Sequence, residues 1–269
     1  AMALARMDIP GLVYYGGTIM PGRIGEREFS IQEVFEAIGA HAAGALDDAG
    51  LKAVERVFAG DHARKYITRR SLQNAAAAVS ASGGSTNAVL HLTAIAAEAG
   101  VEFGVEDCNA ACEATPVICD LKPGGRFLAS HLYAAGGTRL VTQRLAEAGK
   151  IHNAPTVSGR SLFAEAAEAE EAPQQQVIAT VADPVSARGS YAVIYGDVAP
   201  DGAVIKLTGH AVDRFEGPAC VFDSEEDAFH AVQDGSVGEG DVIIIRYEGP
   251  RGGPGMREML QVTAFMTSP

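Results

Sequence analysis

The chain changes from helix-type to strand-type patterning past its middle. Before residue 165, apolar residues recur mainly at helical spacing. From Val177 onward, short runs rich in β-branched residues alternate with Gly, Pro and Asp. Between these parts lies EAAEAEEAPQQQ (165–176), which is acidic, rich in Gln and interrupted by a proline. We predict the α/β class, with an α/β domain over 1–164, a linker over 165–176 and a mainly-β domain over 177–269.

Local signals place the expected elements. Ile9 to Tyr15 is an apolar run that ends at glycines, which is typical of a buried parallel strand, so we expect a parallel sheet in the N-terminal domain. Cap and periodicity signals predict helices over 30–44, 47–57, 71–81, 88–99 and 139–148, and one that starts after Ser224 and ends at Gly235. Strands are expected over 117–121, 177–181, 191–195, 203–208, 219–222 and 241–247.

One of these helical patterns stops abruptly. It fails at Val57, and the next five residues, FAGDH, continue no periodicity before a new helical pattern starts near Thr68. We therefore predict a break in the first domain near 57–58.

Charge and cysteine usage exclude several classes of protein. The formal net charge is −13, which disfavours binding to phosphate backbones and to anionic lipid surfaces, so we expect neither a nucleic-acid nor a membrane partner. Apolar runs are too short for a membrane span. The four cysteines are scattered without secretory context, which favours reduced thiols in a cytoplasmic protein.

GGSTN at 83–87 stands directly before a helical pattern. Two glycines and the start of a helix present backbone N–H groups, and three polar side chains follow, so the segment suits a carboxylate or polyol. The predicted substrate-binding residues are Gly83, Gly84, Ser85, Thr86 and Asn87. A helix-capping corner with no ligand remains an equal alternative, because the same residue types serve as caps.

A second candidate lies at 243–258, where a strand runs into a Gly- and Pro-rich loop before a helix. Glu258 falls in the expected first helical turn, where its carboxylate suits Mg²⁺ or simply favours the helix dipole. The glycine loop at 16–22 is either a binding loop or a turn. Cys108, Cys112 and Cys119 lack a loop that would wrap an iron–sulfur cluster, and buried apolar thiols are the favoured interpretation.

Taken together, the motifs resemble the dihydroxy-acid and sugar-acid (phosphogluconate, aldonate) dehydratase family, and the dihydroxy-acid branch most closely. The resemblance runs from Ile9 to Ala264 and is carried, in the family's order, by YGGTIMPG (15–22), FEAIGAH (35–41), GGSTNAVLHL (83–92), DLKPGGR (120–126), AAGG (134–137), GPA (217–219), VFDSEED (221–227) and RYEGPRGGPGMREML (246–260).

This resemblance implies a cluster-binding α/β domain joined to a β-barrel-like domain, in a homodimer, with a tetramer as the alternative. It implies a hydro-lyase of branched-chain amino-acid biosynthesis, which removes water from a 2,3-dihydroxy acid to give a 2-oxo acid. The implied cofactors are an iron–sulfur cluster, [2Fe–2S] or [4Fe–4S], and Mg²⁺. Glu258 matches the glutamate of the family's Gly-Met-x-Glu motif and is the one Mg²⁺ ligand that carries over.

The chain also departs from the family pattern. The three cluster cysteines belong to segments that are not found here, one of them expected after Val57, and the catalytic serine expected after 256–264 is missing as well. No catalytic residue is therefore assigned. We expect the first domain to be incomplete and the second truncated, in an apo or inactive chain. The alternatives are a sugar-acid dehydratase and a non-catalytic binding relative without the cluster.

Overall fold

A computed structural model of the chain describes residues 57–207, 214–249 and 261–267, residues 55 and 259, and four short strands before residue 29. Contacts divide the chain into two compact units, Ala1–His210 and Ala211–Pro269. The predicted helix over 30–44 and most of the one over 47–57 lie outside the described residues. The predicted binding or turn loop at 16–22 is described only where it forms strand.

The N-terminal strands form two antiparallel hairpins. Strand β1 (Val13–Tyr15) pairs with β2 (Thr18–Met20), and β3 (Arg23–Ile24) pairs with β4 (Arg27–Glu28). The prediction of a parallel strand ending at residue 15 is therefore wrong. Only two residues separate β1 from β2, whereas a parallel crossover needs about a dozen or more.

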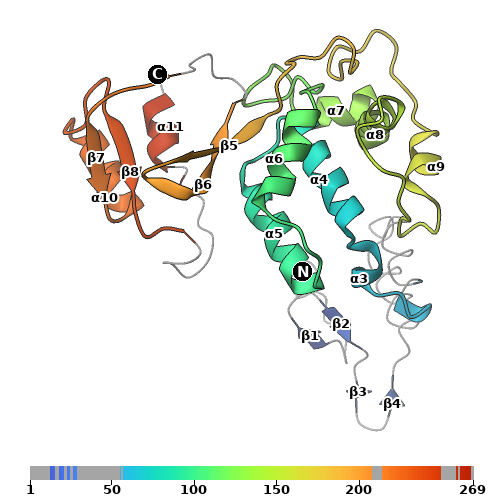
Figure 1. Cartoon of the computed structure of the whole chain (residues 1–269). Helices are drawn as coiled ribbons and strands as arrows, with labels where there is room; N and C mark the ends of the chain where they lie inside the picture. The colour runs from blue at the N-terminus through green and yellow to red at the C-terminus, as the bar shows by residue number, and fades with distance from the viewer. Residues whose placement is uncertain are drawn as a thin grey trace. The chain divides into compact units, whose positions relative to one another are not determined.

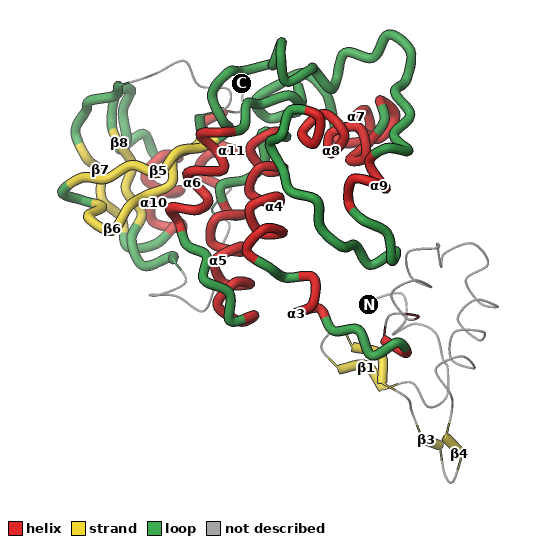
Figure 2. The backbone as a smooth tube through the Cα atoms, turned by 45° about the vertical axis from the view of Figure 1, so that its right-hand side comes forward, coloured by secondary structure: helices red, strands yellow, loops and turns green. Residues whose placement is uncertain are grey.

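Three helices form the centre of the first unit. Helices α4 (Arg69–Ala81), α5 (Asn87–Ala99) and α6 (Val105–Ala114) contact one another (Figures 1 and 2), and the short α3 (Ala63–Tyr66) precedes them. Thr68 caps α4 by accepting a hydrogen bond from the Ser71 N–H. The predicted helices over 71–81 and 88–99 are confirmed.

A second group of helices packs beside α4. It comprises α7 (Ala129–Ala135), α8 (Gly137–Glu147) and α9 (Leu162–Ala166), and α8 confirms the helix predicted over 139–148. Leu140 and Leu145 of α8 are buried with Ile118 and Ile178. The strands predicted over 117–121 and 177–181 are reduced to isolated bridges, including one between Cys119 and Ile178.

The predicted linker over 165–176 lies within the first unit and is tied to its helices. Glu171 pairs with Arg144 of α8 at 2.6 Å, and the Ala172 N–H donates to the Ala135 carbonyl at 3.2 Å. Glu165, Glu168 and Glu171, which suggest a solvated linker, therefore pair with arginines. The predicted domain limits at 164 and 177 stay a prediction.

The first unit ends in an antiparallel hairpin of β5 (Tyr191–Gly196) and β6 (Ala199–Lys206). Both strands were predicted, at 191–195 and 203–208. Tyr191 is buried, and its hydroxyl donates to the Cys108 carbonyl of α6 at 3.0 Å. The register pairs Tyr191 with Lys206, so Lys206 stands at the end of the hairpin that is anchored on α6.

The second unit is a β–α–β arrangement. Strands β7 (Ala219–Phe222) and β8 (Val242–Ile245) are parallel, and α10 (Glu225–Gln233) connects them. Ser224 caps α10 by accepting from the Asp227 N–H, as predicted. Helix α11 (Gln261–Thr267) contacts α10.

Helices combined with small sheets, one of them parallel, place the chain in the α/β class. The parallel pair lies in the second unit, whereas the paired strands described in the first unit are antiparallel. The long connection through α10 explains this, because it gives the chain room for a crossover. The β-barrel-like domain stays a prediction.

Candidate functional site

The glycines of the predicted substrate-binding segment terminate helix α4. Gly83 has a φ of +67°. The Gly84 N–H donates to the Val79 carbonyl at 2.9 Å, and the Gly83 N–H donates to the Ser80 carbonyl at 3.2 Å. This is the hydrogen-bond pattern of a Schellman C-cap. These two N–H groups therefore satisfy the end of α4 and are not available to a ligand.

The residues that follow the glycines keep unused donors. The Asn87 N–H donates to the Ser85 hydroxyl at 3.2 Å, but the N–H groups of Ser85 and Thr86 donate to no other residue in the described part of the chain. They lie at the start of α5, where the helix dipole favours a negative charge. Any anion held by this segment therefore interacts with 85–86 rather than with the glycine N–H groups.

Gly83, Gly84 and Ser85 line a cavity of about 530 Å³ in the first unit. This volume falls within the roughly 300–1,000 Å³ typical of small-molecule sites. Aliphatic side chains form much of its wall, namely Ala78, Val79, Leu121, Leu132 and Val141. Its polar side chains are those of Ser82, Ser85, Thr138, Thr142, Lys122 and Lys206.

The two lysines come from distant parts of the sequence. Lys206 lies on β6, with its Nζ atom 3.5 Å from the Gly83 carbonyl oxygen. Lys122 lies in a tight turn of DLKPGGR, where its N–H donates to the Phe127 carbonyl at 2.8 Å. The residues that line this cavity include two ammonium groups and no carboxylate. Sequence reasoning missed both lysines, since neither stands beside GGSTN in the chain.

The buried carboxylate of Asp120 holds the turn that carries Lys122. It accepts a hydrogen bond from the Arg126 N–H at 2.9 Å and pairs with the Arg126 side chain. Gly125 packs so closely that a Cβ atom there would lie 2.3 Å from Asp120 Oδ1. The position of Lys122 in the cavity wall therefore depends on a glycine at 125.

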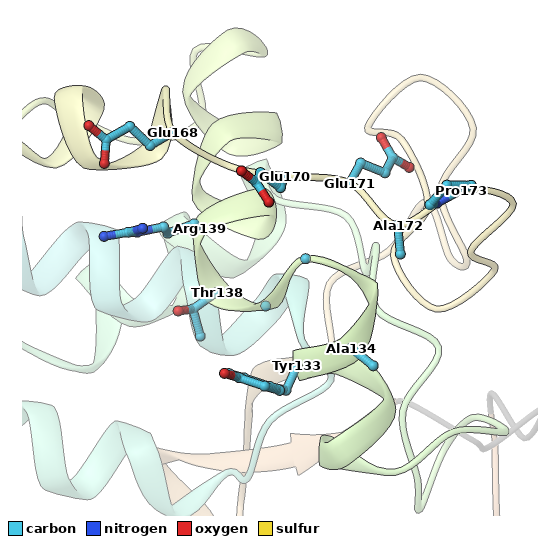
Figure 3. Close-up of a pocket in the computed structure, with 11 residues that line it drawn as sticks. Tyr133, Ala134, Thr138, Arg139, Glu168, Glu170, Glu171, Ala172 and Pro173 are labelled. Carbon is cyan, nitrogen blue, oxygen red and sulfur yellow. The ribbon is translucent and has the colours of Figure 1, made fainter. Parts of the chain in front are cut away.

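A larger cavity, of about 840 Å³, has the opposite electrostatic character. It lies between α7, the start of α8 and residues 168–173, whose acidic side chains Figure 3 shows. Its charged side chains are those of Arg139, Glu168, Glu170 and Glu171. An anionic substrate is disfavoured beside three carboxylates, so the smaller cavity is the better candidate despite its size.

In the second unit, Glu258 and the loop that carries it lie outside the described residues. The segments on either side are described. Arg246 pairs with Asp223 at 2.5 Å, next to the end of β8. The Glu248 carboxylate accepts from the Glu225 N–H at 3.0 Å, and the Glu225 carboxylate accepts from the Gln261 N–H at 3.0 Å. Sequence reasoning missed Glu225 and Glu248, which resemble ordinary surface acids.

The cysteines of the first unit do not form a ligand set. Burial raises the pKa of the Cys108 thiol to about 11 and that of Cys119 to about 12. Burial also raises the pKa of Cys112, whose thiol donates to the Tyr191 carbonyl at 2.9 Å. Metals and clusters bind thiolates, whereas these three groups are buried thiols. In the described part of the chain, no three His, Cys, Asp or Glu side chains converge as a metal site.

Comparison with known families identifies the family of this chain. The model of the dihydroxy-acid/6-phosphogluconate dehydratase C-terminal region matches residues 176–269. The model of the N-terminal region matches in two ranges, 1–61 and 57–165. The chain belongs to the dihydroxy-acid/6-phosphogluconate dehydratase family.

The names of individual relatives are more specific than the family description. The chain is 43% identical to a dihydroxy-acid dehydratase of Koribacter versatilis over 98% of its own length and 56% of the relative. It is 41% identical to one of Thermus thermophilus, over 98% of this chain and 58% of the relative. It is 40% identical to one of a Roseiflexus species, over 98% and 57%. The chain thus spans little more than half the length of these relatives.

The alignments also show residues that this chain lacks internally. The alignment with the Koribacter relative is 320 residues long, although the chain has 269. The two ranges matched by the N-terminal model meet at 57–61, where the helical pattern of the sequence also stops. The predicted break near 57–58 itself stays a prediction. In the described part of the chain, no helix is long and apolar enough to cross a membrane.

Proposed function

We propose that this chain is part of a hydro-lyase that converts a 2,3-dihydroxy carboxylic acid into a 2-oxo acid, as a step of branched-chain amino-acid biosynthesis. The observation that carries the proposal is its membership of the dehydratase family over residues 1–165 and 176–269. The similarity to relatives named dihydroxy-acid dehydratase supports it. In this reaction the C3 hydroxyl leaves as water, the C2 proton is removed, and the resulting enol tautomerises to the 2-oxo acid.

The cavity beside Ser85 suits such a substrate. Lys206 and the free N–H group of Ser85 supply donors for a carboxylate. The aliphatic wall formed with Val79, Leu132 and Val141 suits a short branched hydrocarbon rather than a chain of hydroxyl groups. In this proposal the described residues bind and orient the acid.

The nature of the wall distinguishes the two branches of the family. A sugar acid places hydroxyl groups along its whole chain, and burying them against Leu121 or Val141 leaves their hydrogen bonds unmade. We therefore favour a branched dihydroxy acid over an aldonate or phosphogluconate. Comparing the turnover of 2,3-dihydroxyisovalerate with that of pentonates tests this choice, and faster turnover of pentonates would contradict it.

The cofactors that the family resemblance implies do not fit the described residues. Cys108, Cys112 and Cys119 are buried thiols engaged in packing, and we assign them no role toward an iron–sulfur cluster. Glu258 remains the proposed Mg²⁺ ligand and lies outside the described residues. No step of the reaction is therefore assigned through either group.

A non-catalytic binding relative is the second candidate function. It is favoured by the interrupted match at 57–61. Iron and acid-labile sulfide analysis after anaerobic purification distinguishes the candidates. A stoichiometric cluster together with turnover of 2,3-dihydroxyisovalerate would support the hydro-lyase. Intact mass equal to 269 residues with no iron, but with retained acid binding, would support the binding relative. The implied homodimer is a further proposal, which light scattering tests.

A further inference from the structure

We infer that Lys206 is the residue that fixes the carboxylate end of the ligand in the 530 Å³ cavity, together with the N–H group of Ser85. The ligand class is a small carboxylate with a short aliphatic chain. This inference deepens the proposed function and rests on it for the identity of the acid, although the binding site itself does not depend on turnover.

The pairing of β5 with β6 holds the backbone of Lys206 in place, so this residue does not lie on a mobile surface segment. It pairs with Tyr191 in the β5–β6 ladder, and the neighbouring Leu207 N–H donates to the Ser190 carbonyl at 2.8 Å. Tyr191 is 2% exposed and is bonded through its hydroxyl to α6. The backbone that carries Lys206 is therefore anchored to the helices, and its side chain is partly buried at the cavity.

Lys206 has no carboxylate partner among the described residues. Its polar contact there is the Gly83 carbonyl at 3.5 Å, which is long for a hydrogen bond. Several other cations of the same unit do pair with acids, as Arg139 does with Glu165 and Arg144 with Glu171. A partly buried ammonium group with such a weak partner keeps most of its capacity to bind an anion.

The surroundings of Lys206 also select an anion. Lys122 and Ser85 line the same cavity, and the Ser85 N–H stands unused just before α5. The lining contains no acid, although the whole chain carries a formal net charge of −13. A local positive site in an acidic protein requires nearby donors of this kind to overcome the global field.

The test measures binding of 2,3-dihydroxyisovalerate to the 269-residue chain by titration calorimetry or ligand-detected NMR, in EDTA so that no divalent cation bridges the acid. The variants are K206M, which keeps the aliphatic stem, and K206R, which keeps the charge. The matched control is K150M, because Lys150 is exposed and lies outside this cavity. The neutral amide of the same acid serves as the control ligand.

We expect K206M to raise the Kd for the acid about tenfold or more, K206R to retain part of the affinity, and K150M to match the unmodified chain. The amide is expected to bind weakly to all four proteins. Equal affinity of K206M and the unmodified chain would overturn the inference, as would no binding to the unmodified chain at millimolar acid. A lower melting temperature of K206M with unchanged affinity would show that Lys206 only supports the Gly83 turn.

Failure of the proposed function gives a different combination of binding and turnover results. If the acid binds through Lys206 but is not converted by the protein reconstituted with iron, sulfide and Mg²⁺, the hydro-lyase proposal fails and the binding site stands. If turnover is present and the KM of K206M is unchanged, the proposed function stands and the assignment of Lys206 fails.

Discussion

The carboxylate of Glu225 accepts a hydrogen bond from the backbone N–H of Gln261, with 3.0 Å between the nitrogen and Oε1. In the other direction, the Glu248 carboxylate accepts from the Glu225 N–H at 3.0 Å. Described residues on both sides of the segment 250–258 are thus bonded to one residue at the start of α10. Glu225 therefore ties residues on both sides of that segment to α10.

We predict that E225A destabilises the second unit by about 1–3 kcal/mol, because it leaves the Gln261 N–H without its acceptor in a partly buried place. E225Q keeps an oxygen acceptor and is expected to lose less. Urea unfolding followed by circular dichroism measures both changes. E239A is the control, since Glu239 is exposed. If E239A lowered the free energy of unfolding as much as E225A does, the hydrogen bond between Glu225 and Gln261 would not be the cause.

The end of α4 gives a second prediction. Gly83 adopts a φ of +67°, which residues other than glycine rarely adopt, and Asn tolerates it better than Ala. G83A is expected to lower the free energy of unfolding by about 1 kcal/mol, and G83N by less. Thermal unfolding of the two variants measures this order. If G83A proves as stable as the unmodified chain, the left-handed cap is not required.

Cap and periodicity signals in the sequence located the helices because those signals are local. Thr68, Ser224 and Gly100 stand at helix ends, as the sequence predicts. The direction in which a strand pairs cannot be predicted from the strand's own residues. The apolar run that ends at Tyr15 is compatible with either direction, and the partner at Thr18 decided it.

Only part of the candidate site could be predicted from the sequence. GGSTN marked a turn before a helix, but the lysines that share its cavity lie far along the chain, at 122 and 206. Their approach depends on the 120–127 turn and on the β5–β6 register, which no local pattern encodes. In the segment 165–176, Glu165 and Glu171 pair with arginines of α8, which no local pattern indicates either.

The turn around Gly125 gives a third prediction. A Cβ atom at this position would lie 2.3 Å from Asp120 Oδ1 and 2.7 Å from the Leu121 nitrogen, so the backbone must shift. We expect G125A to destabilise the chain by about 1–3 kcal/mol and to weaken acid binding by moving Lys122. Calorimetric unfolding and the acid titration measure the two effects. G196A is the control, because a Cβ at Gly196 meets nothing within 4 Å, and equal stability losses in both variants would refute the close packing.

The buried thiols give a fourth prediction, which concerns pH. Burial raises the pKa of Cys119 to about 12 in the folded chain, above the ordinary value of 9.0. Below pH 9 both states keep the proton, so this group has no effect on stability there. Between pH 9 and about 12 the unfolded chain releases the proton and the folded chain holds it, so stability falls as the pH rises.

The variant C119A is expected to remove this contribution. It should be less stable than the unmodified chain near pH 8, because a buried group has been deleted, but its stability should decline less steeply above pH 9. The difference in slope is expected to approach about 1.4 kcal/mol per pH unit. Urea unfolding from pH 7.5 to 10.5 measures it. C220A serves for comparison and is expected to change the slope less, because Cys220 is only partly buried, although burial raises the pKa of its thiol as well. If C119A and the unmodified chain declined in parallel, Cys119 would have to ionise equally well in the folded and unfolded chain, which its 2% exposure opposes.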